Sequence, residues 1–325
     1  MVARVRSAVA TGRALTRPTV DLTIQTHPGL VTRIVERPGA TLDDAGLADL
    51  VARLRTVASA ALARGQLNYG VFSGDRDRLS SVVVTLMSDA RTGRPIAFNA
   101  LALLDVELDG EPVTVTHLGL VMVDKEERRR GLSSALYGLT TLLLFVRGAL
   151  RPCWISNVTQ VPAVAGMVCE TFSDVYPSPL SGARQSFAHL TLARRIMRAH
   201  RDAFGVSASS PYDEKRSVII DSYTGGSDDL KKAFDQAQPH RNPLYADFCA
   251  RELDYERGDD FLQIGRMDLA AARRYLAANI PPRSLPALAA AALFLAIQRV
   301  VLPVVYWFDD AHRFGALRPW RRAST

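Results

Sequence analysis

The sequence predicts an α/β fold with a mixed, mostly antiparallel sheet, flanked by helices and extended by further C-terminal helices. Two observations indicate this fold. Asp109-Gly110 separates the strand-like runs 96–108 and 113–123, a strong signal for an antiparallel hairpin. The second run leads through a helical pattern at 132–147 to another strand at 153–158, so this part should be a parallel crossover.

The first third of the chain supplies the elements before that hairpin. Residues 1–28 are predicted to be a flexible basic N-terminus, because the first twenty carry four arginines and no acid. A short strand should follow at 31–35, and Thr41-Leu-Asp-Asp44 should begin a helix that ends near Gly65. The β-branched run 81–87 is the next predicted strand.

After the crossover, Pro162 in a first turn predicts a helix over 162–172. Later patterns predict helices at 188–204 and 269–278, and strands at 217–222 and 261–267 that form a last hairpin. These elements predict one domain over 29–267, with a helical insertion after residue 180. Residues 268–325 should form a helical C-terminal extension.

Composition narrows the function classes. The 325 residues carry a net charge of +7, which suits acidic small ligands, nucleic acid or an anionic membrane surface. Nucleic acid is the weakest of these, because no zinc-finger or RNA-binding motif is present. Three widely spaced cysteines, Cys153, Cys169 and Cys249, predict neither a disulfide framework nor a metal site, and they fit a reducing cytoplasm.

The stretch 116–136 has the features of an anion site. A strand at 116–123 leads into the basic turn Arg128-Arg129-Arg130-Gly131, and a helix should begin at Leu132-Ser133-Ser134. The first N–H groups of a helix lack intrahelical acceptors, and the helix dipole favours negative charge there. Arginine forks pair well with phosphate oxygens, so we expect a phosphate-bearing ligand at this turn.

This stretch resembles motif A of the GNAT superfamily of acyl-CoA-dependent N-acyltransferases. The family motif, Gln/Arg-x-x-Gly-x-Gly/Ala, is matched by Arg128-x-x-Gly131-x-Ser133, in which Ser133, also a small residue, stands where the family has Gly or Ala. The order of elements over 29–175 is also that of the family. The resemblance implies that acetyl-CoA or another acyl-CoA is the acyl donor. The backbone of Val121 and Val123 would then hold its pantetheine arm, and the N–H groups of Arg129 to Ser134 its pyrophosphate.

The resemblance also gives candidates for the acid and the base. The glutamate base of one branch lies eleven residues before the motif, where this chain has His117. Histidine can accept a proton near neutral pH, although a strand histidine is more often structural. The family tyrosine on the helix after the next strand is absent, with Met167 in its place. Tyr176, Cys169 or water are the alternatives for protonating the thiolate.

Three functions are compatible with these residues. The first is transfer of an acetyl or other acyl group to a primary amine of a small molecule. The second is transfer of a long acyl chain to a lipid or membrane-proximal amine. The third is a catalytically degenerate acyl-CoA-binding or scaffold protein. The sequence does not identify the acceptor or the acyl chain length.

The apolar segment 285–308 bears on location. It is long enough to span a bilayer, but Pro286, Pro303 and Arg299 disfavour a simple span. It is expected to be a core helix, a homodimer interface, or a helix on the inner face of a membrane. The protein is accordingly expected in the cytoplasm, with peripheral membrane association as the alternative.

Overall fold

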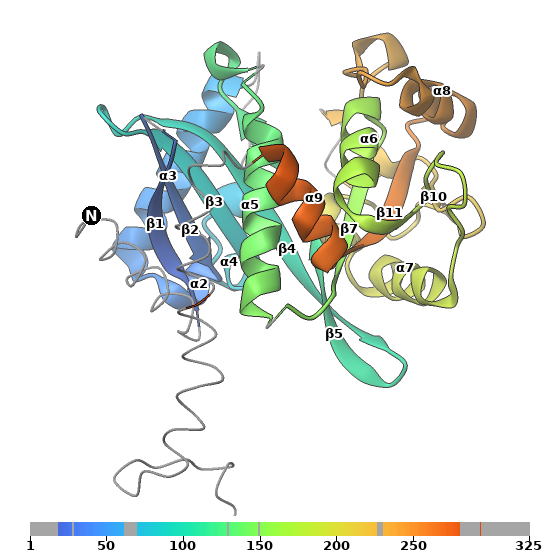
Figure 1. The fold of residues 1–325 in the computed structure, drawn as a ribbon, viewed down its shortest axis with the longest axis horizontal. Helices are drawn as coiled ribbons and strands as arrows, with labels where there is room; N and C mark the ends of the chain where they lie inside the picture. Colours follow the sequence, from blue (N-terminus) through green and yellow to red (C-terminus); the bar gives the residue numbers. More distant parts are fainter. Residues whose placement is uncertain are drawn as a thin grey trace, which may run out of the picture.

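A computed structural model describes residues 19–27, 29–61, 70–128, 130–148, 150–225, 230–279 and 293. Its eleven strands form one sheet with the order β1-β2-β3-β4-β5-β7-β11-β10-β9, while β6 pairs with β4 and β8 with β11. All described pairings are antiparallel except that of β5 with β7. The predicted mixed, mostly antiparallel sheet is therefore confirmed (Figure 1).

The N-terminal half builds one edge of the sheet. Its elements are β1 (Asp21–His27), β2 (Leu30–Glu36), α2 (Pro38–Thr41), α3 (Asp44–Ala61), η1 (Gly70–Phe72), α4 (Arg76–Leu79), β3 (Val82–Asp89), β4 (Pro95–Leu108) and β5 (Glu111–His117). Strand β1 corrects the prediction of a flexible segment over 1–28. It pairs with β2, and Leu22 is buried in an apolar cluster that includes Ile34 and Leu143.

The predicted strand 113–123 is also corrected, because it divides into β5 and β6 (Val121–Val123). Ala102 faces His117 across β4 and β5, whereas Asn99 faces Val121 across β4 and β6, so the register shifts by one residue. Such a shift is a β-bulge, which bends a strand and alters its twist. On their other side, β5 pairs with β7, whereas β6 has no partner among the described strands.

The crossover is as predicted. Helix α5 spans Leu132–Arg147 and leads to β7 (Cys153–Thr159), and α6 follows at Pro162–Thr171. The remaining elements are η2 (Lys125–Glu127), β8 (Ser173–Tyr176), α7 (Phe187–Ala199), η3 (Arg201–Phe204), β9 (Tyr212–Asp213), β10 (Val218–Ile219), η4 (Ser222–Thr224), η6 (Phe234–Gln236), α8 (Pro243–Glu252), β11 (Asp260–Met267) and α9 (Leu269–Asn279). The strand predicted at 217–222 is thus shorter, and it pairs with β11 as the predicted last hairpin.

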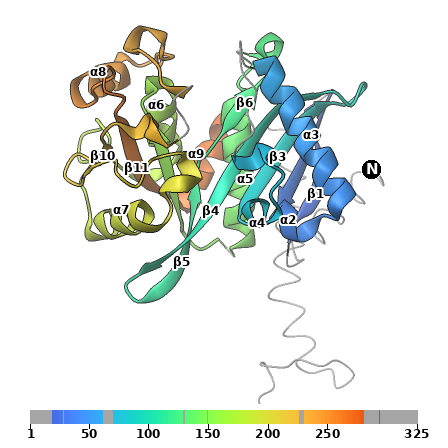
Figure 2. The same cartoon turned by 180° about the vertical axis from the view of Figure 1, so that it is seen from behind.

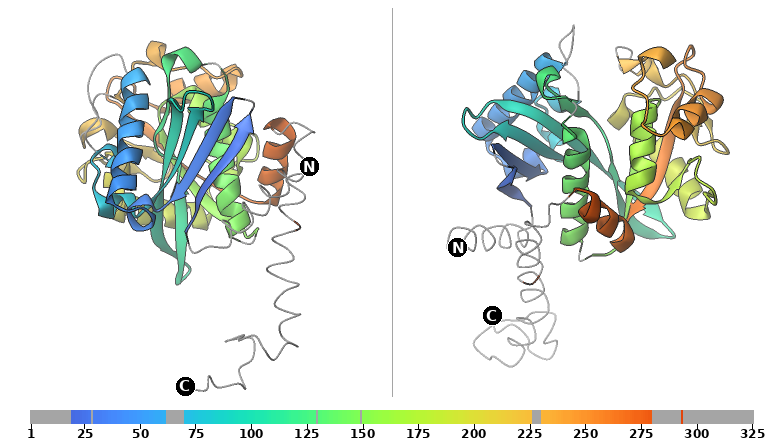
Figure 3. Two further views of the ribbon diagram at one scale, coloured as in Figure 1. Left: turned by 90° about the vertical axis from the view of Figure 1, so that its left-hand side faces the viewer. Right: turned by 45° about the horizontal axis from the view of Figure 1, so that its top comes forward.

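Helices cover both faces of the sheet. Helices α5, α6 and α9 lie on the face seen in Figure 1, and α3, α4 and α7 lie on the opposite face, seen in Figure 2. Figure 3 shows α3 and α5 on opposite sides of β1 and β2. Alternate residues of β4 record the same division: Phe98 and Ala100 pack with α3, whereas Leu101 packs with Tyr137 of α5.

The C-terminal predictions are met only in part. Helix α9 confirms the helix expected at 269–278. The apolar segment 285–308 lies outside the described residues, apart from residue 293. Within the part of the chain that the structure describes, no helix combines the length and the hydropathy that a membrane span requires.

Candidate functional site

The two strands at the centre of the sheet separate. Strand β5 pairs with β7 at Thr116–Ile155 and His117–Ser156, and the N–H of Leu118 donates to the carbonyl of Ser156 over 2.7 Å. Beyond this point β6 pairs with β4, while the last three residues of β7 pair with β11. No pairing joins β6 to β7 among the described strands. A gap therefore opens between them at the end where α5 begins.

The backbone of β6 presents hydrogen-bonding groups to this gap. The carbonyl of Leu120 accepts from Ala100, and the N–H of Asp124 donates to Ile96, both at 2.9 Å and both toward β4. Backbone groups of an extended chain alternate in direction. The N–H and C=O groups of Val121 and Val123 therefore point away from β4 and toward the gap.

A tightly packed glycine fixes the bulge that creates the gap. A Cβ at Gly119 would lie 2.7 Å from the carbonyl oxygen of Ala100, closer than real side chains approach. The hydroxyl of Tyr137, on α5, donates to the carbonyl of Gly119 over 2.7 Å. Strand β4 and helix α5 therefore hold the bulge from two sides.

In the basic turn after β6, the side chains of Arg128 and Arg130 bind other groups of the protein. Arg128 donates to the carbonyl of Ala61 at the end of α3 over 2.8 Å, and Arg130 forms an ion pair with Glu127. Arg94 also pairs with Glu127 and with Asp124. Arg129 lies outside the described residues. Both side chains thus have partners within the protein, and the backbone N–H groups of the turn are the stronger candidates for binding a phosphate.

The start of α5 is open to an anion. Gly131 precedes the helix with φ of 71°, and no other atom lies within 4 Å of the position that a Cβ would occupy there. The first turn contains no acidic residue. Leu132 is buried against Leu30 and Met87, whereas Ser133 is exposed and Ser134 is half-buried. The N–H groups of this turn thus lie at an accessible, uncompensated positive end of the helix.

Gln160, at the end of β7, is an unsatisfied polar side chain. It is 1% exposed, and neither its Oε1 nor its Nε2 has a hydrogen-bond partner among the described residues. A buried amide without partners costs about 1–3 kcal/mol. Such a group, one residue after β7, would gain hydrogen bonds from a polar ligand, such as the amide-containing arm of a pantetheine.

His117 lies where β5 and β7 meet. It is 2% exposed, its Nδ1 lies 3.1 Å from the hydroxyl oxygen of Ser156, and its ring centroid lies 5.1 Å from that of Phe204. Burial lowers the pKa of His117 to about 4, so the imidazole is neutral at pH 7. If Nδ1 carries the proton and donates it to Ser156, Nε2 has a free lone pair.

The two candidate acids are not brought to His117. Tyr176 lies on β8, which pairs with β11, so β11 and β7 separate it from the gap. Its hydroxyl donates to the carbonyl of Lys215 over 2.6 Å. Cys169 packs against Gln263 under α6, and burial raises the pKa of its thiol to about 11. A thiol with this pKa remains protonated at pH 7, and it belongs to the apolar cluster against which Val121 of β6 packs.

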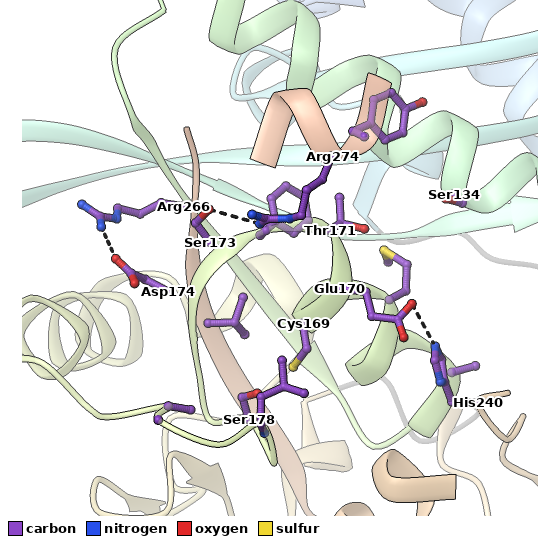
Figure 4. A pocket seen from close by; sticks show the side chains of 18 of the residues that line it. Ser134, Cys169, Glu170, Thr171, Ser173, Asp174, Ser178, His240, Arg266 and Arg274 are labelled. Atoms are coloured by element: carbon purple, nitrogen blue, oxygen red, sulfur yellow. Dashed lines mark hydrogen bonds and ion pairs between the residues drawn. The ribbon is translucent and has the colours of Figure 1, made fainter. Parts of the chain in front are cut away.

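A cavity of about 1490 Å³ adjoins the start of α5. Figure 4 shows Ser134 at one end, Glu170 and Thr171 of α6 in the middle, and Asp174 with Arg266 at the other end. Tyr275 of α9 also lines it. The cavity therefore provides room for a ligand of substantial size that leaves the first turn of α5 along α6.

No protein-family model and no curated protein matches this chain. Parts of it are similar to solved acetyltransferase structures. The ribosomal-protein-S5-alanine acetyltransferase from Vibrio fischeri is 13% identical, with a TM-score of 0.32, over 46% of this chain and 81% of that one. An acetyltransferase of GNAT family from Streptococcus pneumoniae is 13% identical, with a TM-score of 0.29, over 48% and 93%. For glucosamine-6-phosphate N-acetyltransferase from Arabidopsis thaliana the identity is 12% and the TM-score 0.27, over 38% and 78%.

Proposed function

We propose that this protein is an N-acyltransferase that moves an acyl group from acetyl-CoA, or another acyl-CoA, to a primary amine. The observation that carries the proposal is the gap between β6 and β7, which has free backbone groups on one side and the first turn of α5 at its end. An extended thioester with a pyrophosphate needs both features, a backbone to pair with and a positive end for its phosphates.

The donor would be held mainly by backbone. Val121 and Val123 would pair with the amide groups of its arm, and the N–H groups at the start of α5 would bind its pyrophosphate. The donor would also form hydrogen bonds with the buried side-chain amide of Gln160, which has no partner within the described residues. In this arrangement the thioester lies near the junction of β5 and β7, where His117 is placed.

The chemistry requires one proton acceptor. The lone pair of a neutral amine attacks the thioester carbonyl carbon, and a C–N bond forms. The nitrogen then gives a proton to Nε2 of His117, and the C–S bond breaks to release the thiolate. Because β7 and β11 separate Tyr176 from the gap and the Cys169 thiol accepts a hydrogen bond from Gln263, we assign protonation of the thiolate to water. The imidazolium returns its proton to solvent.

Binding of acetyl-CoA tests the donor site most directly. We expect acetyl-CoA to raise the melting temperature of the purified protein, and Ser134→Asp to abolish that rise. An aspartate in the first turn of a helix is favourable to the helix itself, so the unliganded variant should melt no lower than the wild type. Ser178→Asp, at the far end of the cavity, is the control and should still bind. If acetyl-CoA protects Ser134→Asp equally, the proposed pyrophosphate site is wrong.

A non-catalytic acyl-CoA-binding protein is the second candidate, favoured by the distance of Tyr176 from the gap. It predicts the same binding result without transfer. Coenzyme A release in the presence of a panel of primary amines separates the two. Release above the hydrolysis rate with any amine supports the transferase, and tight binding without release supports the alternative.

A further inference from the structure

Phe204 and His117 form a contact that bears on the identity of the acceptor. The two rings are tilted by 32° with their centroids 5.1 Å apart, and they come from segments far apart in the sequence. His117 lies on the face of the sheet that carries α7, because Val115, two residues earlier, packs with α7 residues Leu192 and Ile196. Phe204 therefore covers the base on the face opposite α5.

The backbone around Phe204 is held firmly. Arg201 donates to the carbonyls of Met197, Ser207 and Ser210, and so ties the end of α7 to the loop after η3. Gly205 follows with φ of 70°. A Cβ at Gly225 would lie 2.5 Å from the carbonyl oxygen of Gly205, so η3 is also packed closely against the segment after η4. Phe204 is thus a fixed wall beside His117, in the way that specificity pockets require.

The surroundings of this wall are apolar. Phe204 packs with a buried cluster that includes Val206, Ile219 and Leu262. The hydrogen-bond partner of His117 is the uncharged hydroxyl of Ser156, and no carboxylate bonds to the imidazole among the described residues. The buried carboxyl of Asp260 lies one strand further, four residues from Ile264, the β11 neighbour of Ser156. An ammonium group at His117 would therefore lose its hydration without gaining a counter-charge.

Phe204 itself is only half-buried, so part of its ring remains accessible beside the enclosed imidazole. A molecule that approaches Nε2 from this face meets the Phe204 ring first. Flat apolar groups gain most from such a surface, because aromatic rings pack edge-to-face or offset against one another.

We propose that the acceptor is a neutral primary amine carried on a flat apolar group, in its simplest form an aromatic amine, and that Phe204 selects it. This inference rests on the proposed acyl transfer with His117 as base. The acceptor ring packs against Phe204, its uncharged nitrogen faces Nε2 of His117, and the thioester lies on the gap side. Alkyl diamines are excluded because they carry a charge at both ends.

Three acceptors at pH 7 test this inference: 4-methylaniline, which is neutral and aromatic; benzylamine, which is aromatic but cationic; and 1,4-diaminobutane, which is cationic and aliphatic. We expect kcat/KM with acetyl-CoA to fall in that order. Phe204→Ala should lower the value for 4-methylaniline about 10-fold, the size expected for one lost ring contact. It should leave the KM for acetyl-CoA unchanged. Phe204→Leu, which keeps the apolar packing, should show a smaller loss.

Phe187→Ala is the matched control, because Phe187 begins α7, the helix that precedes η3, and is 72% exposed. A second readout follows the imidazole itself: Phe204→Ala should raise the pKa of His117 in an NMR titration, since water would reach the ring. If that pKa rises while kcat/KM for 4-methylaniline is unchanged, Phe204 only packs and the inference is overturned. If acetyl-CoA binds and 1,4-diaminobutane is the best acceptor, the acceptor class is wrong although the transferase proposal stands. Failure to bind acetyl-CoA overturns both.

Discussion

The Nδ1 atom of His117 lies 3.1 Å from the hydroxyl oxygen of Ser156, across the last residue pair that joins β5 to β7. Both side chains are buried, with exposures of 2% and 0%. The pair therefore lies where the gap between β6 and β7 begins. This contact holds the ring orientation, and in the tautomer whose Nδ1–H donates to the Ser156 hydroxyl, Nε2 is the nitrogen that can accept a proton.

His117→Gln should lower the turnover of acyl transfer at least about 100-fold, because a glutamine cannot act as a base. The dissociation constant for acetyl-CoA should stay within about 3-fold of the wild type, since the backbone and Gln160 hold the donor. Ser156→Ala should cost less, about 10-fold in turnover, because it only loosens the imidazole. Isothermal titration and steady-state kinetics measure the two quantities. Near-normal turnover in His117→Gln would remove the base assignment.

Burial of His117 should make stability depend on pH. The folded-state pKa is about 4 and the unfolded value about 6.5, so the unfolded chain binds the extra proton between these limits. This contribution is complete above pH 6.5 and is lost as the pH falls toward 4. Between pH 7.5 and 5 it amounts to about 2 kcal/mol. Urea unfolding of wild type and His117→Gln at both pH values gives the difference directly, and equal pH slopes in the two proteins would contradict it.

Asp260 should act in the opposite direction. It accepts hydrogen bonds from Ser222 and Tyr223, and burial raises the pKa of its carboxyl to about 7. The folded state then binds the extra proton between pH 4 and 7, so stability falls as the pH rises through that range. Asp260→Asn should remove this loss, which is about 2 kcal/mol between pH 5 and 7.5. The variant should therefore become more stable, relative to wild type, as the pH rises. A constant difference across this range would show that Asp260 titrates normally.

Local signals predicted much of the fold. Asp109-Gly110 forms the predicted turn with φ of 55° and 81°, and α5 has the predicted bounds 132–147 between Gly131 and Gly148. Both predictions depend on residues within a few positions of the element. The errors are of another kind. The strand over 113–123 divides because Gly119 packs against the carbonyl of Ala100 on a neighbouring strand. The residues next to Gly119 in the sequence do not indicate this contact.

In the candidate site, too, local features were predicted and contacts between distant segments were not. The turn before α5 was recognisable because its glycine and the helix start are contiguous in the sequence. The use of Arg128 and Arg130 within the protein was not, since it depends on Ala61 and Glu127. Phe204 was missed entirely, because its contact with His117 joins two segments that no periodic pattern relates. Strand β1 was missed although Leu22 and Ile24 alternate with polar residues. This alternation is too short to indicate a strand by itself, and the strand is evident only from its pairing with β2.

Gln160→Met should separate the stability of the protein from its function. Removal of an unsatisfied buried amide should raise the unfolding free energy by about 1 kcal/mol, while acetyl-CoA affinity falls at least about 10-fold. Gln263→Met is the matched control on the neighbouring strand. The amide of Gln263 bonds to Asn157 and to the carbonyl of Pro177, so this variant should be destabilised. Thermal melts with and without acetyl-CoA report both effects, and loss of stability in Gln160→Met would mean that its amide already has partners.

The effect of Gly138→Ala, in α5, on the stability of the protein should change sign when Tyr275 of α9 is replaced by alanine. Alanine is normally better than glycine in a helix interior by about 1 kcal/mol. A Cβ at Gly138, however, would lie 1.7 Å from the Tyr275 ring, so Gly138→Ala must displace this ring from α5. We expect it to destabilise the wild type by at least about 1 kcal/mol, and to stabilise a Tyr275→Ala background, in which the ring is absent. Chemical denaturation of the four proteins completes the cycle. If Gly138→Ala has the same effect in both backgrounds, α9 does not rest on α5 at this position.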